Sequence, residues 1–99
     1  MKIFLYLVRG FPGLEDMLDR DLLFEAKTIT VAEKKIEMIV DLETISTEKL
    51  FPTKNYAIET DNGKTSDFKY YYLSSFELDE PGKEDIRLTL HVNPIQTSI

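Results

Sequence analysis

The chain opens on an apolar run that predicts a buried β-strand. Every residue from Ile3 to Val8 is aliphatic or aromatic, so hydrophobic side chains would lie on both faces of the strand. A strand that needs cover on both faces belongs in the interior of a sheet. Gly10, Pro12 and Gly13 follow directly and predict that the strand ends in a tight turn.

The next segment has the hydrophobic spacing of an amphipathic helix. Five apolar residues recur at this spacing: Leu14, Met17, Leu18, Leu22 and Ala26. Gly13 is a candidate N-cap, and Glu15 and Asp16 would lie in the first turn, where carboxylates favour the positive end of the helix dipole. The pattern therefore predicts one long helix over residues 14–26 that packs against the sheet.

Alternating apolar residues then predict an antiparallel hairpin. Ile29 and Val31 share one face of a strand at residues 28–32, and apolar residues alternate again from Ile36 to Leu42. Val31 opposite Ile36 keeps both apolar sets on one face of the sheet.

The alternation stops between Ser46 and Asn55. A single capped helical turn before Pro52 is the expectation there, with Leu50 or Phe51 reaching the edge of the core.

The second half of the chain predicts three more strands. Asn62-Gly63 indicates a hairpin turn after a strand at residues 56–60. A three-residue loop with Gly63 in the left-handed conformation would place Tyr56 opposite Phe68 and Ile58 opposite Ser66, which keeps apolar residues together. The next strand runs from residue 68 to 78, with Phe68, Tyr70, Tyr72, Phe76 and Leu78 on one parity. It exceeds the usual strand length, so a bend or bulge is expected at Ser74-Ser75. A turn at Pro81-Gly82 then leads to a final strand over residues 86–92.

These elements predict one α+β domain that spans residues 1–99. Its order would be β-α-β-β-β-β-β, with about six strands in a mainly antiparallel sheet and the helix across one face. No repeat or linker divides the chain.

The composition restricts which cellular compartment and which cofactors we expect for this protein. The chain has no cysteine, so neither a disulfide framework nor a thiolate metal site is expected. The apolar run at the N-terminus lacks a cleavage site, and no segment approaches the roughly 18 apolar residues that cross a bilayer. We therefore expect a cytoplasmic protein without a cofactor.

The charge balance points to a basic partner. Twelve basic and 18 acidic residues give a net charge of −6, which disfavours direct binding to nucleic acid or anionic membranes. Acidic residues are dense in two segments, at 15–25 and 77–85, and Tyr71 is a candidate recognition residue beside the second segment. The predicted partner-binding residues are Glu15, Asp16, Asp19, Tyr71, Glu77, Asp79, Glu80, Glu84 and Asp85.

Motifs for catalysis are weak, and no catalytic, cofactor-binding or metal-binding residue is predicted. The strand and turn at residues 8–13 superficially resemble a P-loop entry, but Glu15, Asp16 and Met17 stand where glycine, lysine and serine or threonine are needed. His91 is the only histidine, and it shares the polar parity of the last strand without a nucleophile motif nearby.

The leading hypothesis is a non-enzymatic inhibitor that docks on a basic, nucleic-acid-binding surface of a partner protein. An immunity protein against a nuclease toxin, or a phage protein of the anti-defence or anti-CRISPR type, would have this chemistry. One alternative is an accessory or structural subunit that associates through a sheet edge or an apolar patch, with homo-oligomers included. Another is a carboxylate-dependent hydrolase that uses pairs such as Asp16 and Asp19.

Overall fold

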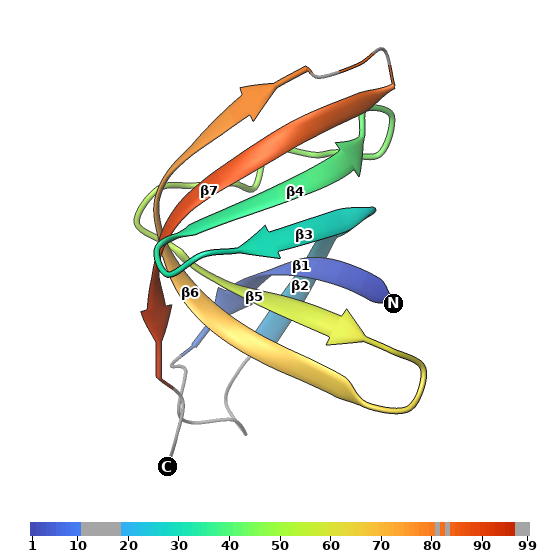
Figure 1. Cartoon of the computed structure of the whole chain (residues 1–99). Coiled ribbons are helices and arrows are strands. Elements are labelled where there is room, and N and C mark those ends of the chain that lie inside the picture. Colours follow the sequence, from blue (N-terminus) through green and yellow to red (C-terminus); the bar gives the residue numbers. More distant parts are fainter. Residues whose placement is uncertain (11–18, 81, 83, 97–99) are drawn as a thin grey trace.

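The protein folds as a single antiparallel sheet of seven strands (Figure 1). A computed structural model describes residues 1–10, 19–80, 82 and 84–96. The strands are β1 (Lys2–Arg9), β2 (Asp19–Ala26), β3 (Thr28–Val31), β4 (Lys35–Asp41), β5 (Asn55–Asp61), β6 (Ser66–Asp79) and β7 (Asp85–Ile95). No helix occurs among these described residues, so the predicted α+β class is wrong and the fold is all-β.

The strand order is β2-β1-β5-β6-β7-β4-β3, and every neighbouring pair is antiparallel. The predicted interior position of the first strand is confirmed, because β1 pairs with β2 on one side and with β5 on the other. The two edges of the sheet are β2 and β3, which Lys27 alone separates in the sequence.

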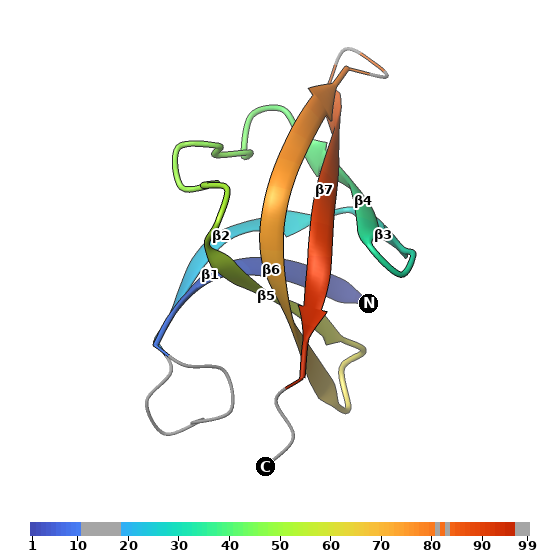
Figure 2. The ribbon, with the colours of Figure 1, turned by 90° about the vertical axis from the view of Figure 1, so that its left-hand side faces the viewer.

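The sheet curls until its two halves face each other. β2 lies against β4, and in Figure 2 the long strands β6 and β7 cross in front of β1 and β2. Strands that bend or carry bulges form the corners of such an arrangement. The main core between the halves contains Ile3, Leu5, Phe24, Ala26, Ile36, Met38, Val40, Leu50, Tyr56, Ile58, Tyr71, Leu73, Leu88, Leu90 and Val92.

The segment predicted to end the helix is β2. The pairing with β1 shifts between Leu5, which faces Phe24, and Tyr6, which faces Leu22, so Leu23 is the extra residue of a bulge. Because of this extra residue, Leu22 points outward and is 55% exposed, whereas Phe24 is buried. The bulge interrupts the two-residue alternation of apolar side chains in β2, so the spacing of its apolar residues resembles that of an amphipathic helix. The first part of the predicted helix, residues 14–18, lies outside the described residues.

The predicted bulge in the long strand is confirmed at Ser74. Leu73 pairs with Val92 and Ser75 with His91, which leaves Ser74 as the extra residue. Leu73 faces the core before the bulge and Phe76 packs against the core after it, although the two residues differ in parity. Tyr70 and Phe76 therefore lie on opposite faces of the sheet, although they share one parity in the sequence.

The two hairpins differ in how well their registers were predicted. In the β3–β4 hairpin Val31 pairs with Ile36, as predicted. In the β5–β6 hairpin Tyr56 pairs with Tyr71 and Ile58 with Lys69, so the predicted pairing of Tyr56 with Phe68 is wrong.

Side-chain hydrogen bonds explain the longer loop at residues 62–65. Asn62 Oδ1 accepts hydrogen bonds from the backbone N–H groups of Lys64 and Thr65 at 3.0 and 2.9 Å. Asp61 Oδ1 accepts one from the N–H of Gly63 at 2.8 Å. Hydrogen bonds of this kind, from nearby N–H groups to Asn and Asp side chains, stabilise the loop at residues 62–65, which is longer than the predicted three-residue loop. Gly63 has a φ of 92°, which agrees with the predicted left-handed conformation.

The connection between β4 and β5 is held by a buried tyrosine. The hydroxyl of Tyr56 accepts a hydrogen bond from the Phe51 N–H at 2.7 Å and donates one to the Lys49 carbonyl at 2.8 Å. Either Leu50 or Phe51 was predicted to reach the core. Leu50 is buried in the main core, whereas Phe51 is 45% exposed. The predicted helical turn is only a hydrogen-bonded turn, in which the Leu50 N–H donates to the Thr47 carbonyl.

A second, smaller apolar cluster lies on the outer face of β1, β5 and β6. Its buried members are Val8, Ala57 and Tyr70. Tyr6 packs beside them and donates a hydrogen bond to Glu59 Oε1 at 2.6 Å, and Ser66 donates to the other carboxylate oxygen. Burial, followed by the hydrogen bond to the Glu59 carboxylate, raises the pKa of Tyr6 to about 12.

We expect Glu59→Gln to lower the pKa of Tyr6 from about 12 toward its ordinary value of 10.0. Burial contributes to the shift as well, so only part of it should disappear. Ultraviolet absorbance titration of the tyrosines measures the change, and Tyr6→Phe assigns the titration. An unchanged Tyr6 titration in Glu59→Gln would show that burial alone causes the shift.

The same shift predicts how stability depends on pH. Between pH 10.0 and about 12 the folded protein keeps the Tyr6 proton that the unfolded chain releases. The folded state then binds more protons, so the free energy of unfolding should fall as pH rises through this window. Burial raises the pKa values of Tyr56 and Tyr71 in the same direction.

Candidate functional site

The structure describes only part of the first predicted acidic segment. Glu15 and Asp16 lie outside the described residues. Asp19 is exposed at the start of β2, and Asp21 forms an ion pair with Arg9 at 3.0 Å. The described part of this segment therefore offers separate carboxylates, one of which already has a basic partner.

Tyr71 is not a surface residue. Its side chain is only 6% exposed and packs in the main core, and its backbone pairs with that of Tyr56. Burial raises the pKa of its hydroxyl. A buried ring offers little area to a partner, so we leave Tyr71 out of the candidate site.

Glu77 and Asp79 lie on the outer face of β6 and face basic residues of β7. Glu77 Oε2 is 3.1 Å from His91 Nε2, and Asp79 Oδ2 is 3.6 Å from Arg87 Nη1. His91 is thus on the polar outer face, as predicted. Arg87 offsets the charge of Asp79, whereas His91, which counts as neutral in the net charge of −6, leaves the charge of Glu77 in place.

The remaining predicted residues, Glu84 and Asp85, form a cluster with two acidic residues from the end of β4. We call Asp41, Glu43, Glu84 and Asp85 the acidic end. Asp41 pairs with Asp85 across β4 and β7, and the Leu42 N–H donates a hydrogen bond to the Glu84 carbonyl at 2.8 Å. Glu80 is exposed just beyond the end of β6, in the connection that leads to Glu84.

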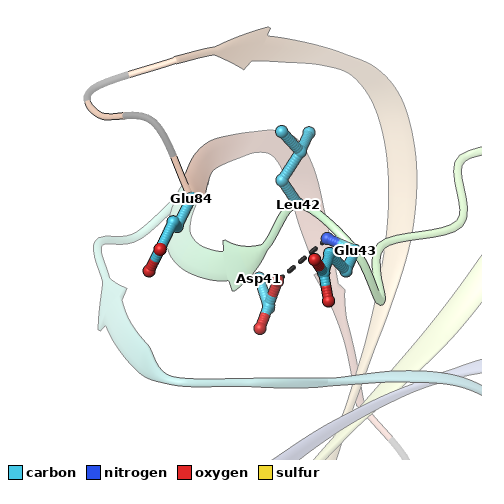
Figure 3. A pocket seen from close by; sticks show the side chains of 4 residues that line it. All are labelled: Asp41, Leu42, Glu43 and Glu84. Carbon is cyan, nitrogen blue, oxygen red and sulfur yellow. Dashed lines mark hydrogen bonds between the residues drawn. The ribbon is translucent and has the colours of Figure 1, made fainter.

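A shallow pocket of about 240 Å³ lies at this end of the sheet, lined by Asp41, Leu42, Glu43 and Glu84. The carboxylates of its three acidic residues point to the same side of the molecule (Figure 3). None of them is buried, so water or a ligand can reach them.

Local hydrogen bonds hold the Asp41 side chain and the backbone of the turn that follows it in place. Asp41 Oδ1 accepts a hydrogen bond from the Glu43 N–H at 2.9 Å, drawn in Figure 3. The Asp41 carbonyl accepts hydrogen bonds from the N–H groups of Thr44 and Ile45 at 3.1 and 3.0 Å. The carboxylates therefore stand on a strand end and a turn of fixed geometry, which lowers the conformational entropy lost when a partner binds.

Lys27 is the basic residue bonded to the acidic end. Its ammonium lies 2.6 Å from Asp85 Oδ1. This hydrogen bond raises the pKa of Lys27, and the charges of Asp85, Asp41 and Glu84 raise it further. Within the described residues, one ammonium is bonded to this set of four carboxylates, so their described surroundings keep an excess of negative charge.

The carboxylates in the described parts of the chain are all exposed or half-exposed. General acid–base catalysis needs a carboxyl group that burial has shifted, and no Asp or Glu in the described parts of the chain is buried. The described residues also contain no group of three or more acidic or histidine side chains that could hold a metal ion. Nor do they form a helix long and apolar enough to cross a membrane.

Asp41 and Glu43 are the residues that sequence reasoning missed. They belong to the acidic end because β4 pairs with β7, a contact between segments far apart in the chain. The only local signal is that the apolar alternation of β4 stops at Asp41 with a second acidic residue soon after it.

No protein-family model, curated protein or solved structure matches this chain.

Proposed function

We propose that this is a non-enzymatic binding protein whose acidic end docks on a basic, nucleic-acid-binding surface of a partner protein. The observation that carries the proposal is the set of four exposed or half-exposed carboxylates at one end of the sheet, one of which, Asp85, forms an ion pair with Lys27. On β4, β6 and β7, three acidic residues outside this set lie within ion-pair distance of a described side chain: Glu37 of Lys35, Asp79 of Arg87, and Glu77 of His91, which is charged only when protonated.

Electrostatics gives the physical reason for this partner class. Carboxylates at fixed positions can take the places that phosphate groups occupy in a basic groove. The net charge of −6 adds long-range attraction to such a groove and repels nucleic acid itself. A protein that covers the groove would inhibit a nuclease or another nucleic-acid-binding protein by excluding its substrate.

Affinity capture from the native host tests the proposal at two salt concentrations, about 0.05 and 0.5 M. We expect the wild-type protein to retain a basic protein at low salt and to release it at high salt. Glu43→Lys combined with Glu84→Lys should abolish the capture, because it reverses two charges of the acidic end. Added nucleic acid should release the captured partner, because it competes with the acidic end for the basic surface of that partner.

A matched control reverses two exposed acidic residues elsewhere, Glu33 in the β3–β4 hairpin and Asp67 near the start of β6. Glu33→Lys with Asp67→Lys changes the net charge equally and should leave the capture in place. Equal loss in both variants would show that only net charge matters. A partner retained at high salt by the Glu43 and Glu84 variant would contradict docking through the acidic end.

A further inference from the structure

The acidic end contains two carboxylates in directly opposite positions of the sheet. Asp41 of β4 and Asp85 of β7 are cross-strand partners, so their side chains leave the same face side by side. Like charges in opposite positions repel each other and destabilise a sheet. A cation placed between the two carboxylates would remove this repulsion.

Lys27 supplies a cation to this pair in the free protein. Its ammonium lies 2.6 Å from Asp85 Oδ1, and its side chain is 50% exposed. The hydrogen bond to Asp85 raises the pKa of Lys27, and the charges of Asp85 and Asp41 raise it further. The ammonium is therefore stabilised by both carboxylates, although it is hydrogen-bonded to Asp85.

The Lys27 side chain can leave this position without a change of fold. Its backbone is fixed separately, because the Lys27 N–H donates a hydrogen bond to the Ile39 carbonyl at 2.7 Å. The side chain of Asp85 is 37% exposed, and an ion pair at the surface contributes little to stability. Lys27 also lines an open hollow of about 670 Å³ together with Leu23 and Ala26, which has room for a displaced side chain.

A guanidinium suits this pair of carboxylates better than an ammonium does. Arginine presents several N–H donors in one plane, and these donors can bond two acceptor groups at once. The ammonium of lysine acts as a compact point charge. Arginine is also the residue that recognises phosphate groups with two parallel hydrogen bonds, so a nucleic-acid-binding surface presents suitable guanidinium groups.

We propose that Lys27 occupies the Asp41–Asp85 pair in the free protein and that an arginine of the partner displaces it on docking. Lys27 is then an internal competitor that lowers the affinity of the acidic end for its partner. This inference rests on the proposed docking of the acidic end. It adds which group of the partner is bound and which contact within the protein must open first.

Binding of a nona-arginine peptide to the purified full chain, measured by isothermal titration calorimetry at about 0.05 M salt, tests the proposal. Lys27→Met should bind the peptide at least about threefold more tightly than Lys64→Met, which changes the net charge equally in the exposed loop at residues 62–65. Lys27→Arg keeps the net charge and should bind at least about threefold less tightly than Lys64→Arg, because its guanidinium is the stronger competitor. Circular dichroism checks that the variants fold.

The substitution Asp85→Asn links the effect to its site. In this background Lys27→Met and Lys64→Met should bind the peptide with affinities within about twofold of each other, because Lys27 no longer covers a carboxylate. Equal affinities of Lys27→Met and Lys64→Met in the wild-type background overturn the proposal. So does a gain from Lys27→Met that persists undiminished in Asp85→Asn, or a Lys27→Arg variant that binds as tightly as Lys64→Arg.

A separate comparison shows whether the docking itself fails. Glu43→Lys with Glu84→Lys should weaken peptide binding more than Glu33→Lys with Asp67→Lys, which changes the net charge equally. If these two double variants bind the peptide equally, docking through the acidic end is wrong and the competition by Lys27 is wrong with it. If they differ as expected while Lys27→Met matches Lys64→Met, the acidic end binds basic groups without displacement of Lys27.

Discussion

Deleting both Ser74 and Ser75 should lower the free energy of unfolding by at least about 4 kcal/mol or prevent folding altogether. Ser74 is the extra residue that lets Leu73 and Phe76 face the same core although their parities differ. Deleting Ser74 alone would leave Leu73 and Phe76 on one face, because Ser75 then separates them in a regular alternation. Without both serines Leu73 and Phe76 become neighbours, so the part of β6 beyond them must either shift its register with β7 or turn its side chains over. Glu77 would then face the core in place of Phe76. Chemical denaturation followed by circular dichroism measures the loss.

The control for this deletion is Ser74→Ala, which keeps the number of residues and removes only a weak, exposed hydrogen bond from Asn93 at 3.4 Å. It should cost less than about 1 kcal/mol. If the deletion of both serines were no more destabilising than Ser74→Ala, the faces of β6 would not depend on the number of residues between Leu73 and Phe76.

Leu88→Ala should destabilise the protein by about 2 to 5 kcal/mol. Leu88 is 0% exposed in the main core on β7, between its cross-strand neighbours Leu78 of β6 and Met38 of β4. Truncation removes buried methyl groups at a site where two ladders hold the backbone, so the cavity can collapse only partly.

Leu78→Ala is the natural comparison, because Leu78 pairs with Leu88 but is 45% exposed. It should cost less than about 1 kcal/mol in the same denaturation experiment. If both substitutions lowered the free energy of unfolding equally, the core would not lie between the two halves of the curled sheet.

Local alternation was sufficient to predict several strands. The apolar run at residues 3–8 indicated an interior strand, and Val31 opposite Ile36 followed from parity alone. The excess length of the segment before Leu78 indicated the bulge at Ser74. In each case a short stretch of sequence contained the whole signal.

Other features depend on contacts that short stretches do not contain. The strand β2 was mistaken for a helix because the extra residue Leu23 disturbs its alternation, and only pairing with β1 reveals the bulge. The register of the β5–β6 hairpin depends on side-chain hydrogen bonds made by Asn62 and Asp61. Both errors arose where one residue more or less reverses the face of every residue that follows.

The candidate site was predicted in part. Glu84 and Asp85 were included from their local acidic density, but the same reasoning included Glu77 and Asp79, which face His91 and Arg87 across the sheet. Charge density along a sequence does not show which carboxylates are neutralised by a neighbouring strand. The pairing of β4 with β7 decides this, and it brings Asp41 to the acidic end.

The central claim is that carboxylates at one end of a rigid sheet guide this protein to a basic surface. The most direct test is the association rate constant with the captured partner, measured over a range of ionic strengths. We predict that the rate falls steeply with added salt for the wild type, and that Glu43→Lys with Glu84→Lys lowers it at least about tenfold at low salt. A rate that is insensitive to salt and unchanged in this variant would contradict the claim.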